Sequence, residues 1–342
     1  MLTMMLLAVA IAGTDPSPVL EISGTHFTLD GEPTFLLGAS YYGALGIEDR
    51  DTLRADLDDL KAHGFNWIRV WATWNAFDDN LCAVAPDGTP REPYMGRLKR
   101  LCRMAGRRGM VVDVTVTRQK TDEFPSNMSE HRAVIKTLAD HLKPFRNVYI
   151  DVGNERNVGD ARHVPMNEVA ELIALVKRLD PSRLCTASQG GDIGEEETVA
   201  YIDAGKVDFI CPHRPRDRNS PGHTAATTKE YFQQMTRASR VVPVHYQEPF
   251  RRGYGRYSPS ADDFMTDLEA AHSSGAAGWC FHNGSVRGQP DNEDGRPRRS
   301  FDMRPEEGRL FDQLDDVERD FMSRVKQKNW GAVPSERSET EL

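Results

Sequence analysis

Short apolar runs alternate with longer amphipathic stretches along most of the chain. The runs are rich in β-branched and aromatic residues, which is typical of buried parallel strands. Eight of them occur, at Phe35–Ala39, Trp67–Trp71, Met110–Val116, Val148–Val152, Leu184–Ala187, Val207–Cys211, Val241–Tyr246 and Gly278–Phe281. The stretches between them place apolar residues three and four positions apart, which predicts helices that cover a sheet.

The expected helices span Leu53–His63, Met95–Arg107, His131–Leu142, Val169–Leu179, Tyr231–Arg237, Ala261–His272 and roughly Glu306–Val325. Several stretches end on a glycine, as at His63-Gly64, Arg108-Gly109 and Ala204-Gly205, which is a common helix stop. Eight strands, most of them followed by a helix, predict one α/β domain, a (β/α)8 TIM barrel over residues 19–325. A doubly wound open sheet is the alternative, but the first turn, residues 38–43, lacks its Gly-rich fingerprint.

The two ends of the chain carry different signals. Val19–Ile22 and His26–Leu29 flank a turn, which predicts a small β-hairpin that closes the bottom of the barrel. Residues 1–12 are largely apolar and end in Ala10-Ile11-Ala12, which predicts a signal peptide and a secreted or periplasmic protein. The usual basic start is missing, so a disordered leader or a mis-assigned start is the alternative. The polar tail 331–342 is expected to be disordered.

Composition excludes some classes of partner. The 342 residues carry a formal net charge of −9, which argues against non-specific binding of nucleic acid. No stretch after the leader is long and apolar enough to predict a membrane span. The oligomeric state is left open.

The cysteines are few and scattered. None of the five lies in a C-x-x-C pair, so no thiolate zinc site is predicted. Cys185, Cys211 and Cys280 lie in expected strands and read as core residues, whereas Cys82 and Cys102 are candidates for one bridge if the protein is exported.

Two glutamates follow expected strands at the points where those strands end. Glu155 comes after the fourth run and Glu248 after the seventh. In a parallel barrel these carboxyl ends form the mouth where active sites assemble. Paired carboxylates there predict glycoside hydrolysis, in which a carboxyl group with a raised pKa protonates the leaving group and an ionised one attacks. The alternative for each is a surface carboxylate near a helix N-terminus.

Longer motifs carry a family resemblance. Four features together resemble the clan A retaining glycoside hydrolases. They are Asn154-Glu155 after the fourth run, a glutamate after the seventh, the stretch 26–42, and the stretch 63–71 that contains Arg69. The similarity is to their cellulase-like members (glycoside hydrolase family 5), and it covers roughly residues 20–325.

The resemblance implies roles for individual residues. Glu155 would be the general acid/base and Glu248 the nucleophile. Asn154 would hydrogen-bond the sugar 2-hydroxyl, and Arg69 would keep the nucleophile ionised. For Arg69 the alternative is a buried structural ion pair.

The chain departs from the family pattern at three strand ends. The end of the third run, Val114-Thr115-Val116-Thr117-Arg118, lacks a histidine that is common in the family. After the sixth run the chain reads Cys211-Pro212-His213-Arg214-Pro215-Arg216, in which His213 matches the family histidine but the expected tyrosine is absent; Tyr246 is a candidate in its place. After the eighth run the family has a sugar-stacking Trp; Trp279 is the candidate, but it falls inside the strand, so core packing is the alternative. Phe281 and His282 lie nearer the mouth, and His282 is a further candidate for substrate binding. A substrate other than plain cellulose is therefore expected.

Further candidates for substrate binding are aromatic. Trp71, Trp74 and Tyr42 lie at strand ends where rings stack on sugars, although core packing is the alternative for each. No H-x-H or H-E-x-x-H spacing supports a metal, and we predict no metal and no cofactor.

The sequence thus predicts a retaining β-glycoside hydrolase whose partner is an oligo- or polysaccharide. Two alternatives remain open. One is a non-catalytic carbohydrate-binding protein on the same barrel, and the other is a barrel hydrolase or lyase for a different substrate.

Overall fold

The computed structural model describes residues 17–74, 79–117, 123–158, 162–249, 251–252, 257–283, 301, 303–305 and 308–333. The strands are β1 (Leu20–Ser23), β2 (His26–Leu29), β3 (Glu32–Thr34), β4 (Leu36–Ser40), β5 (Trp67–Trp71), β6 (Val111–Thr115), β7 (Val148–Asp151), β8 (Leu184–Thr186), β9 (His245–Tyr246), β10 (Arg251–Arg252) and β11 (Gly278–Asn283). The helices are α1 (Arg50–Ala62), α2 (Tyr94–Gly106), α3 (Met128–Leu142), α4 (Met166–Leu179), α5 (Glu195–Asp203), α6 (Ser220–Met235), α7 (Ala261–Ser273) and α8 (Asp316–Val325), with 3-10 turns η1 (Tyr42–Gly46) and η4 (Leu310–Gln313).

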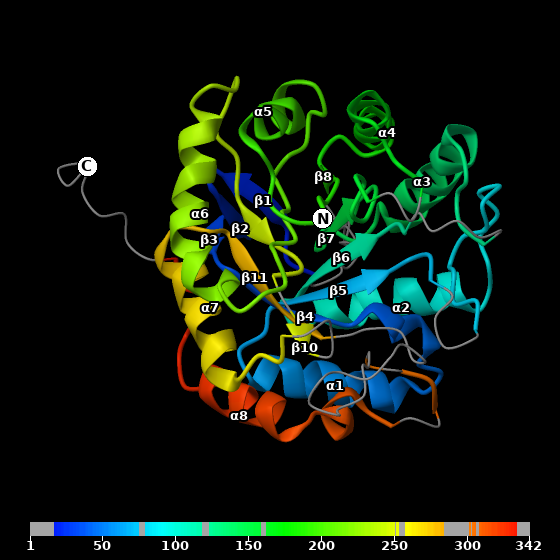
Figure 1. The fold of residues 1–342 in the computed structure, drawn as a ribbon. Coiled ribbons are helices and arrows are strands. Elements are labelled where there is room, and N and C mark those ends of the chain that lie inside the picture. Colours follow the sequence, from blue (N-terminus) through cyan, green and yellow to red (C-terminus); the bar gives the residue numbers. More distant parts are fainter. Residues whose placement is uncertain are drawn as a thin grey trace, which may run out of the picture.

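The central sheet curls into the predicted (β/α)8 barrel, with helices around its outside (Figure 1). Parallel pairing runs in the order β11-β4-β5-β6-β7-β8, and β9 pairs with β11 on its other side. Because all these strands are parallel, their carboxyl ends meet at one mouth.

The expected sixth strand is an extended segment without a continuous ladder. It joins its neighbours through isolated bridges, Ile210 to Val244 and Gln189 to Pro212. Pro212 and Pro243 lack the N–H group that a full ladder needs, which also explains why β9 is shorter than expected. The backbone N–H of Ile210 still donates to the Pro243 oxygen at 3.0 Å, so the barrel closes here.

Helix boundaries differ from the sequence-based ranges mainly around α5 and α6. Helix α5 was signalled only by the glycine stop after it, and α6 starts well before Tyr231. The first turns of α6 carry Ser220, Pro221 and Gly222, which gives them little of the apolar periodicity that reveals a helix.

Side chains alternate between the inside and the outside of the barrel along each strand. In β5, Trp67 and Arg69 face inward, and Ile68 and Val70 pack against the helices. This period of two decides which polar residues reach the interior.

The N-terminal hairpin closes the bottom of the barrel as predicted, and β3 extends it to three strands. Its Phe27 is fully buried and packs on Tyr149, Phe209 and His245 inside the barrel, with ring centroids 6.5, 5.0 and 5.2 Å away. The apolar floor lies at the end opposite the mouth.

All five cysteines are buried free thiols, so Cys82 and Cys102 are not bridged in this structure. Burial raises the pKa of each of these two thiols to about 12. Among the helices that the structure describes, none is long and apolar enough to cross a bilayer. The predicted leader, residues 1–12, and most of the tail, residues 334–342, lie outside the described residues.

Candidate active site

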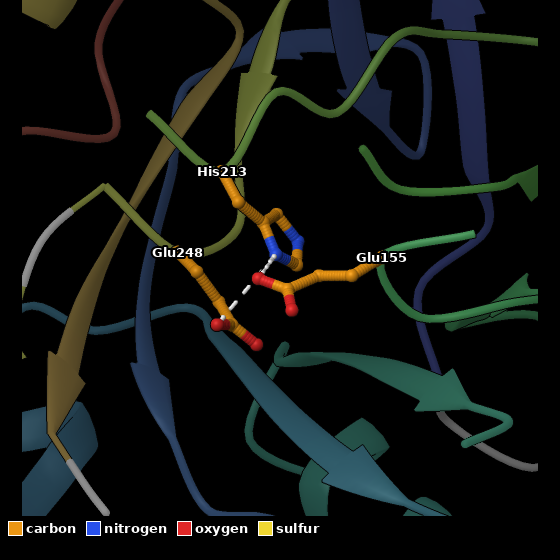
Figure 2. Close-up of side chains that lie close together, drawn as sticks. All are labelled: Glu155, His213 and Glu248. Atoms are coloured by element: carbon orange, nitrogen blue, oxygen red, sulfur yellow. Dashed lines mark hydrogen bonds and ion pairs between the residues drawn. The ribbon is translucent and has the colours of Figure 1, made fainter. Parts of the chain in front are cut away.

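Glu155 and Glu248 meet at the mouth of the barrel. Their carboxylates point toward one another, with the imidazole of His213 beside both (Figure 2). One oxygen of each carboxylate and one nitrogen of His213 all lie within 4.8 Å of one another. Tertiary structure thus brings together two glutamates from distant parts of the chain, as catalysis by a pair of carboxyl groups requires.

The backbone around Glu155 is shaped for the site. Glu155 has a φ of 43°, in the left-handed region that non-glycine residues seldom adopt. Its N–H donates to the Ser188 hydroxyl at 3.0 Å, which holds this turn in place. A Cβ on Gly190 would lie 2.6 Å from Val158 and 3.4 Å from the Glu155 carboxyl carbon, so glycine leaves room here for the glutamate. Such strained positions often occur at functional sites.

Arg69 is the fully buried cation that organises the inner wall of the site. Its guanidinium donates to Asp113 at 3.0 Å, to Asp151 at 3.4 Å and to Glu248. It also donates to Asn154 Oδ1 at 2.8 Å. Burial opposes the charge, but the carboxylates of Glu248, Asp113 and Asp151 raise the pKa of Arg69 well above its usual value. The contact expected between Arg69 and Glu248 is present.

Glu248 is held as an anion. Burial alone would raise the pKa of Glu248, yet the groups around it hold that pKa well below its usual value. Those groups are His213, His282, Arg69 and Arg216. An ionised carboxylate in this position is what a nucleophile requires.

Glu155 is also ionised, which differs from the expectation of a raised pKa. Burial would raise it, but the hydrogen bond with His213 at 3.1 Å and the charge of Arg216 lower the pKa of Glu155 to about 2. The Nη2 atom of Arg216 lies 2.9 Å from Glu155 Oε1 and 2.8 Å from Glu248 Oε2.

An aromatic wall flanks Glu248. Tyr42 stacks on Trp71 with a centroid distance of 4.6 Å, and Trp74 meets both rings edge-on. The Tyr42 hydroxyl lies 2.5 Å from Nδ1 of His282, whose Nε2 lies 3.3 Å from Glu248 Oε2. Of the three aromatic rings, that of Trp71 is half-buried, whereas Trp74 is 2% exposed and packs behind it.

Two candidates for substrate binding require correction. Trp279 is fully buried, and its Nε1 donates to Asp267 of α7 at 2.6 Å. Tyr246 is also fully buried, and its hydroxyl lies 2.6 Å from the Thr228 hydroxyl of α6. Both side chains face the helices, because successive residues of a strand point to opposite sides. Tyr246 directly follows the inward-facing His245, and Trp279 lies three residues before the inward-facing His282. Neither reaches the mouth.

An inner layer of polar residues was not predicted from the sequence. Asp113 and Gln247 are fully buried, and Gln247 Nε2 donates to Asp113 at 2.8 Å. Burial raises the pKa of Asp113 to about 7, although Arg69 acts in the opposite direction. Asp113 could have been found from the sequence, because it lies opposite Arg69 on the neighbouring strand and therefore faces the same side, the barrel interior. The sequence signal for Arg216 was weaker: it follows His213 in the segment where the family tyrosine is missing.

Glu155, His213 and Glu248 also form a donor set of a kind that holds metal ions. Because Arg216 donates to both carboxylates, a cation would have to displace its guanidinium. We assign no metal to this site.

A parallel barrel with two facing glutamates and a buried arginine at its mouth defines a protein of the TIM-barrel glycosidase class. Sequence comparison makes the assignment specific, since residues 20–237 match the model of the cellulase family, glycosyl hydrolase family 5. The chain belongs to this family, whose members act on O-glycosidic bonds.

Individual relatives are distant. A mannan endo-1,4-beta-mannosidase from Mytilus edulis is 25% identical over 184 residues, which span 48% of this chain and 48% of that protein. The matched part therefore covers about half the length of this curated relative. A family 5 mannosidase from Rhizomucor miehei has a TM-score of 0.62 at 13% identity, over 92% of this chain and 100% of the other. The β-mannanase of Mytilus edulis has a TM-score of 0.58 at 16% identity, over 93% and 99%. These structures share the fold.

Proposed function

We propose that this protein is a retaining β-glycoside hydrolase that uses Glu155 as general acid/base and Glu248 as nucleophile. The observation that carries the proposal is the approach of these two carboxylates within 4.8 Å at the mouth of the barrel. Arg69 supports the assignment, because it bonds Glu248 and leaves Glu155 as the residue that takes up and releases a proton.

In the first step, a Glu248 oxygen attacks the anomeric carbon while the bond to the leaving-group oxygen breaks. Glu155 gives its proton to that oxygen, and a covalent glycosyl-enzyme forms. Asn154 would bond the sugar 2-hydroxyl through its amide NH2 group, since Arg69 already donates to its Oδ1.

In the second step, Glu155 is a carboxylate and takes a proton from water. The hydroxyl attacks the anomeric carbon, the bond to Glu248 breaks, and the sugar leaves with its original configuration. Both glutamates then return to their starting forms. Trp71, the half-buried ring of the aromatic wall, would stack on a sugar face beside the reacting bond, with Tyr42 packed behind it.

The proposed substrate is a β-linked oligo- or polysaccharide. The names of the relatives make β-1,4-mannan the first candidate to test. We further propose that the protein is exported, on the basis of the apolar stretch 1–12. N-terminal sequencing of protein from the culture medium tests export, and an intact Met1 there would contradict cleavage.

One observation favours the second candidate, a carbohydrate-binding protein without turnover. Arg216 bonds both glutamates, and neither carboxylate carries the proton that a general acid needs. A protein that has lost catalysis would keep such a bridge permanently. The two functions differ in their response to mutation of the glutamates.

The test is hydrolysis of mannan, other β-linked polysaccharides and aryl β-glycosides by wild type, Glu155→Gln and Glu248→Ala. We expect wild type alone to release reducing sugar from a polysaccharide. Glu155→Gln should still cleave dinitrophenyl glycosides, whose leaving group needs no proton, whereas Glu248→Ala should not. Glycan binding without turnover by wild type would favour the second candidate.

A further inference from the structure

One guanidinium nitrogen joins the two glutamates of the site. Arg216 lies in the loop between the sixth barrel segment and α6, and its Nη2 donates to Glu155 Oε1 at 2.9 Å and to Glu248 Oε2 at 2.8 Å. Its side chain is 17% exposed. Neither the resemblance to family 5 nor the proposed mechanism gives this residue a task.

Arg216 and substrate exclude one another. In the proposed reaction the anomeric carbon and the leaving oxygen must lie between Glu155 and Glu248. The Nη2 group already occupies that position, within hydrogen-bond distance of both carboxylates. A productive complex therefore requires the guanidinium to move away.

The departure of Arg216 affects the two glutamates unequally. Glu248 still faces Arg69 of β5, His282 of β11 and His213. Glu155 keeps the contact with His213, but it also faces the negative charge of Glu248. Without the guanidinium, the free-energy balance at Glu155 moves toward the protonated form.

We propose that Arg216 is a positioning residue that closes the resting site, and that its displacement by substrate lets Glu155 take a proton from solvent and become the general acid. The inference rests on the proposed hydrolase function. It explains how a glutamate that is ionised in the resting enzyme serves as an acid, since the guanidinium leaves and a proton replaces its charge.

The loop around Arg216 indicates that its side chain moves rather than its backbone. On one side, Arg214 donates to Asp192 at 2.6 Å and to the Ser220 oxygen at 3.1 Å. On the other side, Asp217 accepts from the Asn219 N–H at 2.8 Å. Rotation of the Arg216 side chain alone clears the space between the glutamates.

The first test needs no turnover. The Glu155 carboxyl is titrated by NMR in ligand-free protein with 13C-labelled glutamate, and Glu155→Gln assigns the signal. In Arg216→Met we expect the pKa of Glu155 to rise by about 1 to 3 pH units. The matched control is Arg218→Met, an exposed arginine of the same loop, which should titrate like wild type. An unchanged pKa in Arg216→Met would overturn the proposal.

The second test is kinetic. Because the guanidinium no longer competes with substrate, Arg216→Met should lower KM by about tenfold, and kcat should change less than KM. The alkaline limb of its kcat/KM profile, which reports the free enzyme, should move to higher pH. A raised KM would mean that Arg216 binds substrate, and would overturn the proposal.

The two readouts separate this inference from the proposed function. If no variant and no wild type hydrolyses any glycan, the function fails, whereas the titration still decides whether Arg216 controls the charge of Glu155. If Arg216→Met does not fold, Arg216→Gln takes its place in both tests, because it also removes the charge.

Discussion

At the scale of single residues, the site depends on how a few buried charges compensate one another. Arg69 forms ion pairs with the carboxylates of Asp113, Asp151 and Glu248, and its side chain has no contact with solvent. Such a cluster stabilises the fold only while it stays complete, because removal of one partner leaves desolvated charge behind. The same residue thus supports the fold and the proposed nucleophile.

Arg69→Met is expected to lower the free energy of unfolding at pH 7 by about 3–5 kcal/mol. The three carboxylates would then have raised pKa values in the folded state, so the folded variant binds more protons than the unfolded chain. The loss of unfolding free energy in Arg69→Met, relative to wild type, should therefore become smaller as the pH falls from 7 to 5. Urea denaturation at both pH values measures this. Lys136→Met, which removes a surface pair with Asp140, is the control and should cost less than about 1 kcal/mol. An equal deficit for Arg69→Met at both pH values would contradict the argument.

At the scale of elements, strand parity separates the site from the packing layer. His282 of β11 reaches the proposed nucleophile, while Trp279 of the same strand points to α7. The polar end of the Trp279 ring is satisfied by Asp267, which also accepts from Thr224 of α6. One buried carboxyl group thus joins two helices and a strand.

This junction predicts a pH dependence of stability. Burial raises the pKa of Asp267 to about 6, against a usual value of 3.8. The folded state therefore holds this proton more tightly than the unfolded chain. The resulting stability is complete below pH 3.8 and is lost as the pH rises through about 6.

Asp267→Asn keeps an acceptor for Trp279 but does not titrate. Its free energy of unfolding, relative to wild type, should rise by roughly 1–3 kcal/mol between pH 4.5 and 7. Guanidinium denaturation across that range provides the measurement. A constant difference between the two proteins would show that Asp267 does not titrate in this range.

At the scale of the whole molecule, the barrel interior is layered from floor to mouth. The hairpin residue Phe27 and the rings of Trp67, Tyr149 and Phe209 fill the floor. Arg69 forms the layer above with Asp113 and Asp151, and Glu155 and Glu248 lie at the mouth. In barrels of this kind the floor serves stability and the mouth serves chemistry.

Phe27→Ala tests this division. The lost packing and the cavity should lower the free energy of unfolding by about 3–5 kcal/mol, and Phe27→Leu should cost less than about 1.5 kcal/mol. The pKa of Glu155 in folded Phe27→Ala should match wild type, because the charged layer separates floor and mouth. Denaturation and the same NMR titration check both parts, and a shifted pKa would show that the layers are coupled.

The (β/α)8 barrel and the positions of both glutamates at strand ends could be predicted from the sequence. Strand and helix periods are local properties, so the runs before Glu155 and Glu248 were recognisable without any contact map. The hairpin was equally local. The weak points were the sixth segment, where prolines interrupt the ladder, and α6, whose first turns lack apolar periodicity.

Only the tertiary structure decided which side chains face the site and what charge they carry. Trp279 and Tyr246 face the helices because a strand turns alternate residues to opposite sides, and the packing of the barrel decides which side is the interior. The ionised state of Glu155 depends on Arg216 and His213, which reach it from another part of the chain. A pKa is set by burial and by neighbours in space, and a linear sequence states neither of them.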